Sequence, residues 1–139
     1  MFFIINYSYM KNLNDKLIYP DLSYDITGIC FKVHNELGRF AREKQYCDAI
    51  ERYLQASNIV YQREYIFETT GNRLDFIVED KIILEIKAKR MLLRDDYYQL
   101  QRYLQSLDKK LGLLLNFRSR FLKPARVIRI DTDARKKFV

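Results

Sequence analysis

Two acidic side chains and a lysine have the spacing needed to meet on one face of a β-hairpin. Asp75 and Glu85 both lie in short runs that are rich in β-branched and aromatic residues. Side chains alternate between the faces of a strand, so a short connecting loop sets Asp75 opposite Glu85 and Ile77 opposite Ile83. Opposed residues have Cβ atoms about 5 Å apart, and Lys87 shares the same face. We therefore expect two neighbouring carboxylates with a lysine beside them.

Two facing carboxylates in an apolar hairpin repel each other unless something compensates their charge. A hard divalent cation compensates it well, because Mg²⁺ binds one or two carboxylates together with water and phosphate oxygens. The alternative is that Lys87 neutralises the pair at a solvated edge of the sheet. The run from Ile82 to Ile86 is apolar on both faces apart from Glu85, which favours a central strand and hence the metal site.

The hydrophobic periodicity predicts the elements that position these residues, in the order ααβββαββ. Ser23 or Asp25 is the expected N-cap of the first helix, and Gly38 is its expected end. The order predicts an α/β domain over residues 23–131, with a mixed sheet of about four or five strands flanked by helices. An N-terminal arm would cover residues 1–22 and a basic tail residues 132–139. The expected helices cover 25–37, 43–56 and 94–107, and the expected strands cover 60–67, 73–78, 81–88, 111–117 and 125–130.

The composition fits one domain, and its positive charge permits a polyanionic partner or serves solubility alone. The chain has 139 residues, of which 48% are hydrophobic, and this excludes collagen-like, low-complexity and wholly disordered proteins. Its 25 basic and 18 acidic residues give a net charge of +7. Residues 116–139 hold eight Lys and Arg against two Asp, so most of the excess charge lies near the C-terminus. A clustered excess of this kind permits a nucleic-acid partner, although a basic end is often only solvated.

The cysteine and histidine content limits other chemistry. Cys30, Cys47 and His34 are too few for a closed zinc site, which needs four such ligands. Cys30 and His34 lie one helical turn apart, but a buried cysteine is a better interpretation than a nucleophile. Two cysteines give no disulfide framework, so we expect a reduced, cytoplasmic location. No run approaches the ~20 apolar residues of a transmembrane helix, so we expect no membrane association.

The carboxylate–lysine arrangement resembles the PD-(D/E)XK nuclease superfamily, in which an Asp on one strand precedes Glu-x-Lys on the next. The chain also resembles the GxxExxY proteins, a family within that superfamily. Two positions depart from the pattern, since Phe40 replaces the Gly of the family name and Leu74 replaces the Pro of the superfamily label. The matching segments are Val33–Gly38, Glu43–Tyr46, Arg73–Asp75, Leu84–Ala88, Gln99–Leu100 with Tyr103–Leu104, and Leu111–Phe117.

The resemblance implies a restriction-endonuclease-like fold and a set of site residues. Lys87 would position or deprotonate the attacking water, and Gln99 would orient water or backbone. The alternatives without a functional role are that Gln99 is a surface residue and that Glu36 is an ordinary carboxylate at a helix end. The implied ligands of Mg²⁺, or of Mn²⁺ in its place, are Glu36, Asp75, Glu85 and the main-chain carbonyl of Ile86.

The implied function is Mg²⁺-dependent hydrolysis of phosphodiester bonds in DNA or RNA. Arg73, Arg118, Arg120 and Lys123 are the expected phosphate contacts. The alternative is a non-catalytic module that binds nucleic acid or joins a complex and has kept the nuclease fold, and a weaker one is a metal-binding structural subunit. A homodimer is a further hypothesis about partners.

Overall fold

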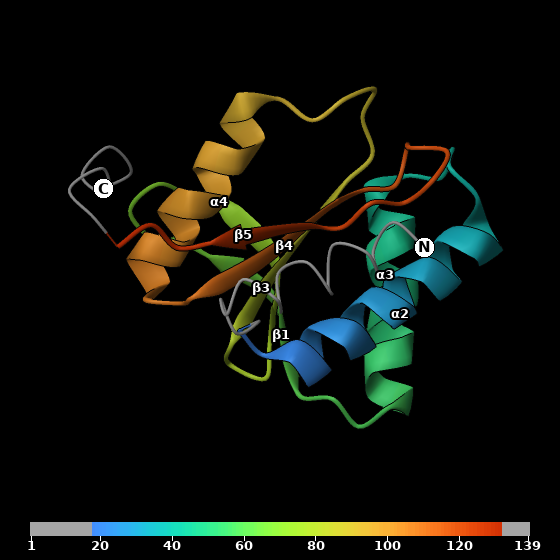
Figure 1. The fold of residues 1–139 in the computed structure, drawn as a ribbon, viewed down its shortest axis with the longest axis horizontal. Helices are drawn as coiled ribbons and strands as arrows, with labels where there is room; N and C mark the ends of the chain where they lie inside the picture. Colours follow the sequence, from blue (N-terminus) through green and yellow to red (C-terminus); the bar gives the residue numbers. More distant parts are fainter. Residues whose placement is uncertain (1–17, 132–139) are drawn as a thin grey trace.

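The computed structural model describes residues 18–131. Residues 1–17 and 132–139, which include most of the expected arm and the whole expected tail, lie outside the described residues. The element order ααβββαββ is confirmed (Figure 1). The elements are α2 (Pro20–Leu37), α3 (Glu43–Ala56), β1 (Tyr61–Ile66), β2 (Arg73–Val78), β3 (Ile82–Lys87), α4 (Arg94–Leu107), β4 (Leu111–Asn116) and β5 (Ala125–Ile128).

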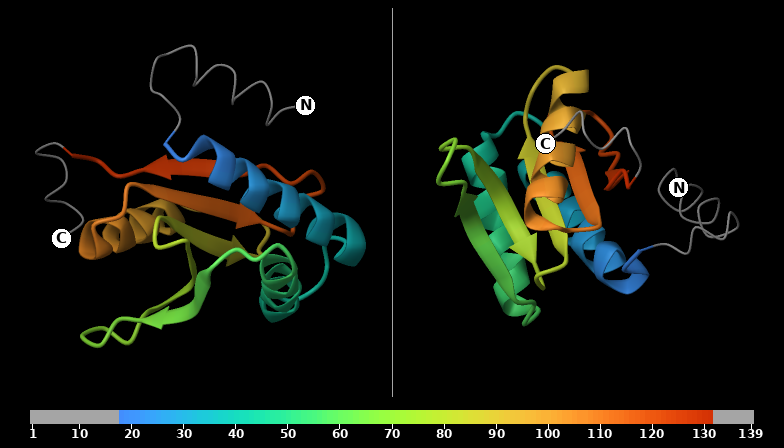
Figure 2. Two further views of the ribbon diagram at one scale, coloured as in Figure 1. Left: turned by 90° about the horizontal axis from the view of Figure 1, so that it is seen from below. Right: turned by 90° about the vertical axis from the view of Figure 1, so that its left-hand side faces the viewer.

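The five strands form one mixed sheet in the order β1-β2-β3-β4-β5. β1, β2 and β3 form an antiparallel meander, β3 and β4 run parallel, and β5 returns antiparallel to β4. The parallel pair requires a crossover connection, which α4 supplies. The helices α2 and α3 cover one face of the sheet and α4 covers the other (Figure 2). No helix in residues 18–131 is long and apolar enough to span a membrane.

β3 is the central strand that its apolar sequence predicts. Ile82, Leu84 and Ile86 pack toward α2 and α3, and Ile83 packs toward α4. Every residue from Ile82 to Ile86, including Glu85, is at most 5% exposed. A charged side chain in this strand is therefore removed from water. Burying such a charge without a counter-charge is energetically costly.

The predicted register between β2 and β3 is confirmed for Ile77 with Ile83, whereas the predicted pair of Asp75 with Glu85 lies beyond the last paired residues, Phe76 and Leu84. The strict alternation of faces fails at Leu74, which packs with the cluster on the α4 side and not with Phe76. The ladder between β2 and β3 stops at Phe76, so Leu74 is paired only with Tyr65 of β1. A two-stranded ribbon twists more than a wider sheet, and this twist accounts for the changed direction.

The first helix begins earlier than the sequence analysis predicted. α2 starts at Pro20, and neither Ser23 nor Asp25 is its N-cap. Proline is well suited to the first turn of a helix because it lacks the N–H that would be unpaired there. Ser23 is instead buried inside the helix, where its hydroxyl donates to the carbonyl of Pro20 at 3.2 Å. The helix α2 thus spans residue 22, where the sequence analysis expected the boundary between arm and domain.

Candidate active site

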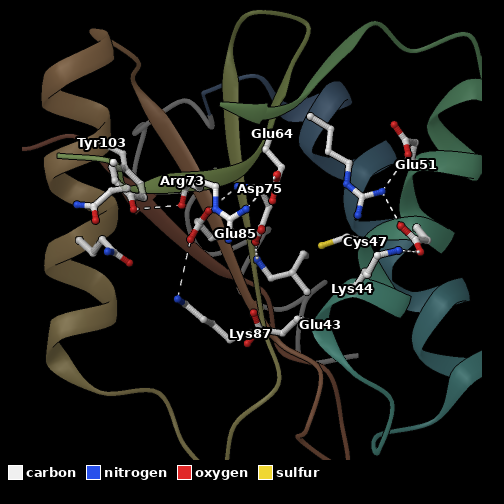
Figure 3. Close-up of a pocket in the computed structure, with 16 residues that line it drawn as sticks. Glu43, Lys44, Cys47, Glu51, Glu64, Arg73, Asp75, Glu85, Lys87 and Tyr103 are labelled. Atoms are coloured by element: carbon white, nitrogen blue, oxygen red, sulfur yellow. Dashed lines mark hydrogen bonds and ion pairs between the residues drawn. The ribbon is translucent and has the colours of Figure 1, made fainter. Parts of the chain in front are cut away.

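A polar cavity of about 980 Å³ opens where β2 and β3 separate, between α3 and α4 (Figure 3). The structure brings most of the predicted site residues together here. The predicted residues that line the cavity are Arg73, Asp75, Glu85, Ile86, Lys87 and Gln99. The predicted residues that do not line it are Glu36, Arg118, Arg120 and Lys123.

Asp75 and Glu85 are joined by two reciprocal hydrogen bonds at the point where the strands part. The main-chain N–H of Asp75 donates to Oε1 of Glu85 at 2.8 Å. The main-chain N–H of Ile86 donates to Oδ2 of Asp75 at 2.7 Å. The two carboxylates thus pair amides beyond the last rung of the ladder, and this holds both side chains in fixed positions. Oδ1 of Asp75 and Oε2 of Glu85 accept no hydrogen bond from residues 18–131.

The charge of this pair is poorly compensated. Burial, followed by the negative charge of Asp75, raises the pKa of Glu85 to about 8. Burial, together with the charge of Glu43, raises the pKa of Asp75 to about 6, although the N–H of Ile86 opposes the change. Lys87 lowers both pKa values without restoring them to the ordinary range. The site therefore favours any additional positive charge at neutral pH.

Lys87 lies beside the pair, as predicted. Its Nζ is 4.0 Å from Oε2 of Glu85 and 3.9 Å from Oδ1 of Asp96, so it stands between two carboxylates. Asp96 also binds Lys89 at 3.0 Å. The buried amide of Asn116 donates to the carbonyl of Lys89 at 2.7 Å and accepts from its N–H at 3.0 Å. These contacts fix the chain that leaves β3 and therefore the lysine at its end.

A family comparison agrees with this geometry. A model of the PD-(D/E)XK nuclease superfamily matches residues 20–130. The chain belongs to this superfamily. The mixed five-stranded sheet between helices is accordingly its restriction-endonuclease-like fold. None of the curated proteins compared with the chain matches it.

A solved structure described as the crystal structure of SSO0001 aligns with the chain at 19% identity and a TM-score of 0.44. The alignment covers 78% of this chain and 68% of that one.

Four further carboxylates line the cavity, and Glu36, which was predicted to approach it, is not among them; they are Glu43, Asp48, Glu51 and Glu64. Glu36 lies away from the cavity and accepts a hydrogen bond from the hydroxyl of Tyr53, so its predicted approach to the site is wrong. Glu43 lines the cavity instead, and its Oε2 accepts from the N–H of Ala88 at 3.2 Å.

The two faces of α3 explain why Glu43, and not Glu36, lines the cavity. Positions 43, 47 and 51 form one stripe of α3 that faces the cavity. Tyr46, Ile50 and Tyr53 form another stripe, which packs toward α2 and meets Glu36 there.

The cavity walls are tied together by side chains from three elements. Arg63 of β1 pairs with Asp48 at 2.8 Å and Glu51 at 2.9 Å, which fixes α3 against the sheet. The hydroxyl of Tyr103 on α4 donates to the carbonyl of Arg73 at 3.3 Å. Gln99 lies one turn before Tyr103 and is half-buried in the cavity wall. Arg63 was missed by the sequence analysis, because it lies between Gln62 and Glu64 in a half-exposed strand, where a charged residue is ordinary.

The donor set suits a hard cation that keeps part of its water shell. No group of three or more His, Cys, Asp or Glu side chains in residues 18–131 forms a metal-binding cluster. Asp75 and Glu85 nevertheless offer one oxygen each that accepts no hydrogen bond from these residues, and Lys87 compensates the charge of the pair only in part. Mg²⁺ binds proteins through one or two carboxylates and retains several waters, whereas a closed zinc site needs four protein ligands. The residues present therefore fit Mg²⁺ or Mn²⁺.

The cysteines do not contribute a nucleophile. Cys30 is fully buried, and burial raises the pKa of its thiol far above the ordinary value. His34, one turn further along α2, is bonded through Nε2 to the carbonyl oxygen of Ser119 at 2.9 Å. Cys47 lines the cavity, yet burial and the charge of Asp75 also raise the pKa of its thiol. The thiols are thus protonated at neutral pH.

Proposed function

We propose that this protein is a divalent-metal-dependent nuclease that hydrolyses phosphodiester bonds of DNA or RNA. The observation that carries the proposal is the Asp75–Glu85 pair, held by reciprocal main-chain hydrogen bonds beside Lys87 in an open cavity. A stability role alone gives no reason to bury two carboxyl groups side by side where ionisation of both is unfavourable.

We assign Asp75, Glu85 and the main-chain carbonyl of Ile86 as the protein ligands of Mg²⁺, for which Mn²⁺ can substitute. When bound, the ion supplies Lewis acidity at the phosphoryl oxygens. Glu43 adds negative charge to the same cavity, as its effect on the pKa of Asp75 indicates, and takes the role first expected of Glu36.

Lys87 holds the attacking water and offsets the charge that develops on the phosphoryl group. Its distance of about 4 Å from both Glu85 and Asp96 places its ammonium group at the cavity wall without a close ion pair. Gln99 orients water or the substrate backbone from the α4 side of the cavity. Arg73, at the exposed start of β2, pairs with Glu64 at 3.5 Å and would contact a neighbouring phosphate of the substrate.

We further propose that the chain is a GxxExxY protein. The motif has a structural reason here, because Tyr46 is fully buried and its hydroxyl donates to the carbonyl of Gly38 at 2.6 Å. The same hydroxyl accepts the N–H of Ala41 at 3.1 Å. The motif tyrosine thus holds the loop that leads into Glu43, the motif glutamate that lines the cavity.

A cytoplasmic location is supported by the two cysteines, which are both buried free thiols. The structure describes a single chain and supplies no support for a homodimer.

A cleavage assay tests the function. Purified protein is incubated with single-stranded and duplex DNA and RNA in Mg²⁺, Mn²⁺ or EDTA, beside Glu85→Gln, Lys87→Met and the control Asp80→Asn. We expect cleavage that needs the metal and falls at least about a hundredfold in the first two variants. The control should match wild type, because Asp80 lies in the exposed hairpin turn and pairs with Lys109. Binding of nucleic acid without metal-dependent cleavage would favour the non-catalytic module.

A further inference from the structure

Two phenylalanine rings are largely exposed on neighbouring loops, and arginine guanidinium groups lie close to both rings. Phe40 in the loop between α2 and α3 is 74% exposed, and Phe121 in the loop between β4 and β5 is 70% exposed. The guanidinium carbons of Arg39 and Arg118 lie 4.9 Å and 5.6 Å from the centroid of the Phe40 ring. That of Arg120 lies 5.4 Å from the Phe121 ring. These five residues are called the Arg–Phe surface below.

The Arg–Phe surface is held in place by contacts between its two loops. Nε of Arg39 donates to the carbonyl of Arg118 at 2.9 Å, and Nε of Arg118 donates back to the carbonyl of Arg39 at the same distance. Beneath them, the buried ring of Tyr46 packs on Phe117 with centroids 4.4 Å apart. Because both loops are anchored, a ligand that uses this surface pays little ordering entropy.

The charge on the Arg–Phe surface is not neutralised within the described chain. None of the ion pairs among residues 18–131 involves Arg39, Arg118 or Arg120. Arg63 and Arg129 differ, since each binds two carboxylates. The terminal N–H groups of the surface arginines make no ion pair within residues 18–131 and are available to an anionic partner, and arginine suits phosphate especially well.

The Arg–Phe surface adjoins the proposed active site along the chain. Phe40 lies three residues before Glu43, which lines the cavity. Asn116 pairs with Lys87 in the sheet and accepts the N–H of Arg118 at 3.3 Å. Both loops lie together beyond the end of β3 that carries the catalytic lysine (Figure 1). A polynucleotide leaving the cavity at this end therefore meets the two rings.

We infer that the Arg–Phe surface binds unpaired nucleotides next to the cleavage position, with bases stacked on Phe40 and Phe121 and phosphates held by the arginines. The inference rests on the proposed nuclease function and names its substrate as one with a single-stranded segment. Exposed rings and guanidinium planes are surfaces on which any unpaired base can stack. The bases of an intact duplex are already stacked on each other, so phosphate binding to a duplex alone gives no reason for two exposed phenylalanines.

The test compares variants that differ only at the two rings. Anisotropy titrations in EDTA, where cleavage is blocked, use oligo(dT), oligo(U) and a duplex, each of about 12 nucleotides or base pairs. The variants replace both phenylalanines together by leucine or by tyrosine. The leucine pair keeps an apolar surface but lacks a ring, and the tyrosine pair keeps the ring. Both positions are largely exposed, so folding is expected to be unaffected, and a thermal melt checks this.

We expect the leucine pair to bind single strands about tenfold to a hundredfold more weakly, while the tyrosine pair binds like wild type. The leucine pair should bind the duplex as wild type does and should keep the salt dependence of wild type, since stacking releases no counterions. Single-strand binding that is unchanged in the leucine pair, or is absent from wild type, overturns the inference. Neither result depends on cleavage, so failure of the nuclease proposal is seen separately in the Mg²⁺ assay.

Discussion

Replacing Glu85 with glutamine should stabilise the metal-free protein at pH 8 far more than at pH 5. The amide oxygen of glutamine can still accept the N–H of Asp75, while the negative charge is removed from a side chain that is only 5% exposed. In wild type, burial and the charge of Asp75 raise the pKa of Glu85 from 4.5 to about 8. The folded state therefore keeps a proton that the unfolded state releases, and wild-type stability falls as the pH rises between these two values.

The magnitude follows from the free energy of ionisation. Each pKa unit corresponds to about 1.4 kcal/mol, so three pH units across this window correspond to at most about 4 kcal/mol. Asp75 ionises in the same range because its own pKa is raised to about 6, and part of the repulsion disappears while it is protonated. We expect the free energy of unfolding of Glu85→Gln, relative to wild type, to increase by about 2 to 4 kcal/mol from pH 5 to pH 8.

Urea unfolding in EDTA at both pH values, followed by circular dichroism, measures this difference. Glu85→Ala serves as the control, because it removes the charge and also the acceptor of the Asp75 N–H. An amide left unpaired costs about 1 to 3 kcal/mol, so alanine should be less stable than glutamine at either pH. Parallel pH profiles for wild type and Glu85→Gln would refute the argument, and a clear loss of stability in Glu85→Gln at pH 8 would show that the carboxylate is structural.

Three further predictions concern the metal, the carboxylates and the basic loop. Mn²⁺ at a hundred times its Kd should stabilise wild type by about 3 kcal/mol at pH 8, which a shift of the urea midpoint measures. Glu43→Gln should lower the rate of metal-dependent cleavage at least about tenfold, whereas Glu36→Gln should leave the rate within about twofold of wild type. A larger loss in Glu36→Gln than in Glu43→Gln would instead support Glu36 as the metal ligand expected from the sequence. Neutralising Arg118, Arg120 and Lys123 together should reduce the slope of log affinity against log salt by roughly one for each lost phosphate contact. Cleavage at saturating substrate should change little, and identical salt slopes would mean that these residues are only solvated.

The carboxylate pair could be predicted because its position depends on local rules. Strand alternation and a short loop fix which residues of a hairpin face each other, and the observed pairing of Ile77 with Ile83 follows these rules. The same alternation placed Lys87 beside Glu85. The burial of β3 was predictable too, because a strand that is apolar on both faces needs cover from both sides.

Features that depend on how separate elements pack could not be read from the sequence. Glu36 and Glu43 both lie near the loop that joins two helices, and only the rotation of α3 against the sheet decides which of them faces the cavity. The direction of Leu74 depends on where the ladder between β2 and β3 ends. The closeness of Phe40 to the loop after β4 likewise depends on contacts between residues that are 79 positions apart in the sequence.

Mn²⁺ binding at pH 8 is the sharpest test of the proposed divalent metal site at Asp75 and Glu85. Electron paramagnetic resonance measures the free ion as Mn²⁺ is titrated into wild type, Asp75→Asn, Glu85→Gln and the control Asp80→Asn. We expect a Mn²⁺ site in wild type and the control, and we expect its affinity to be lost or weakened at least about tenfold in each of the other two variants. Equal Mn²⁺ affinity in all four proteins would contradict it.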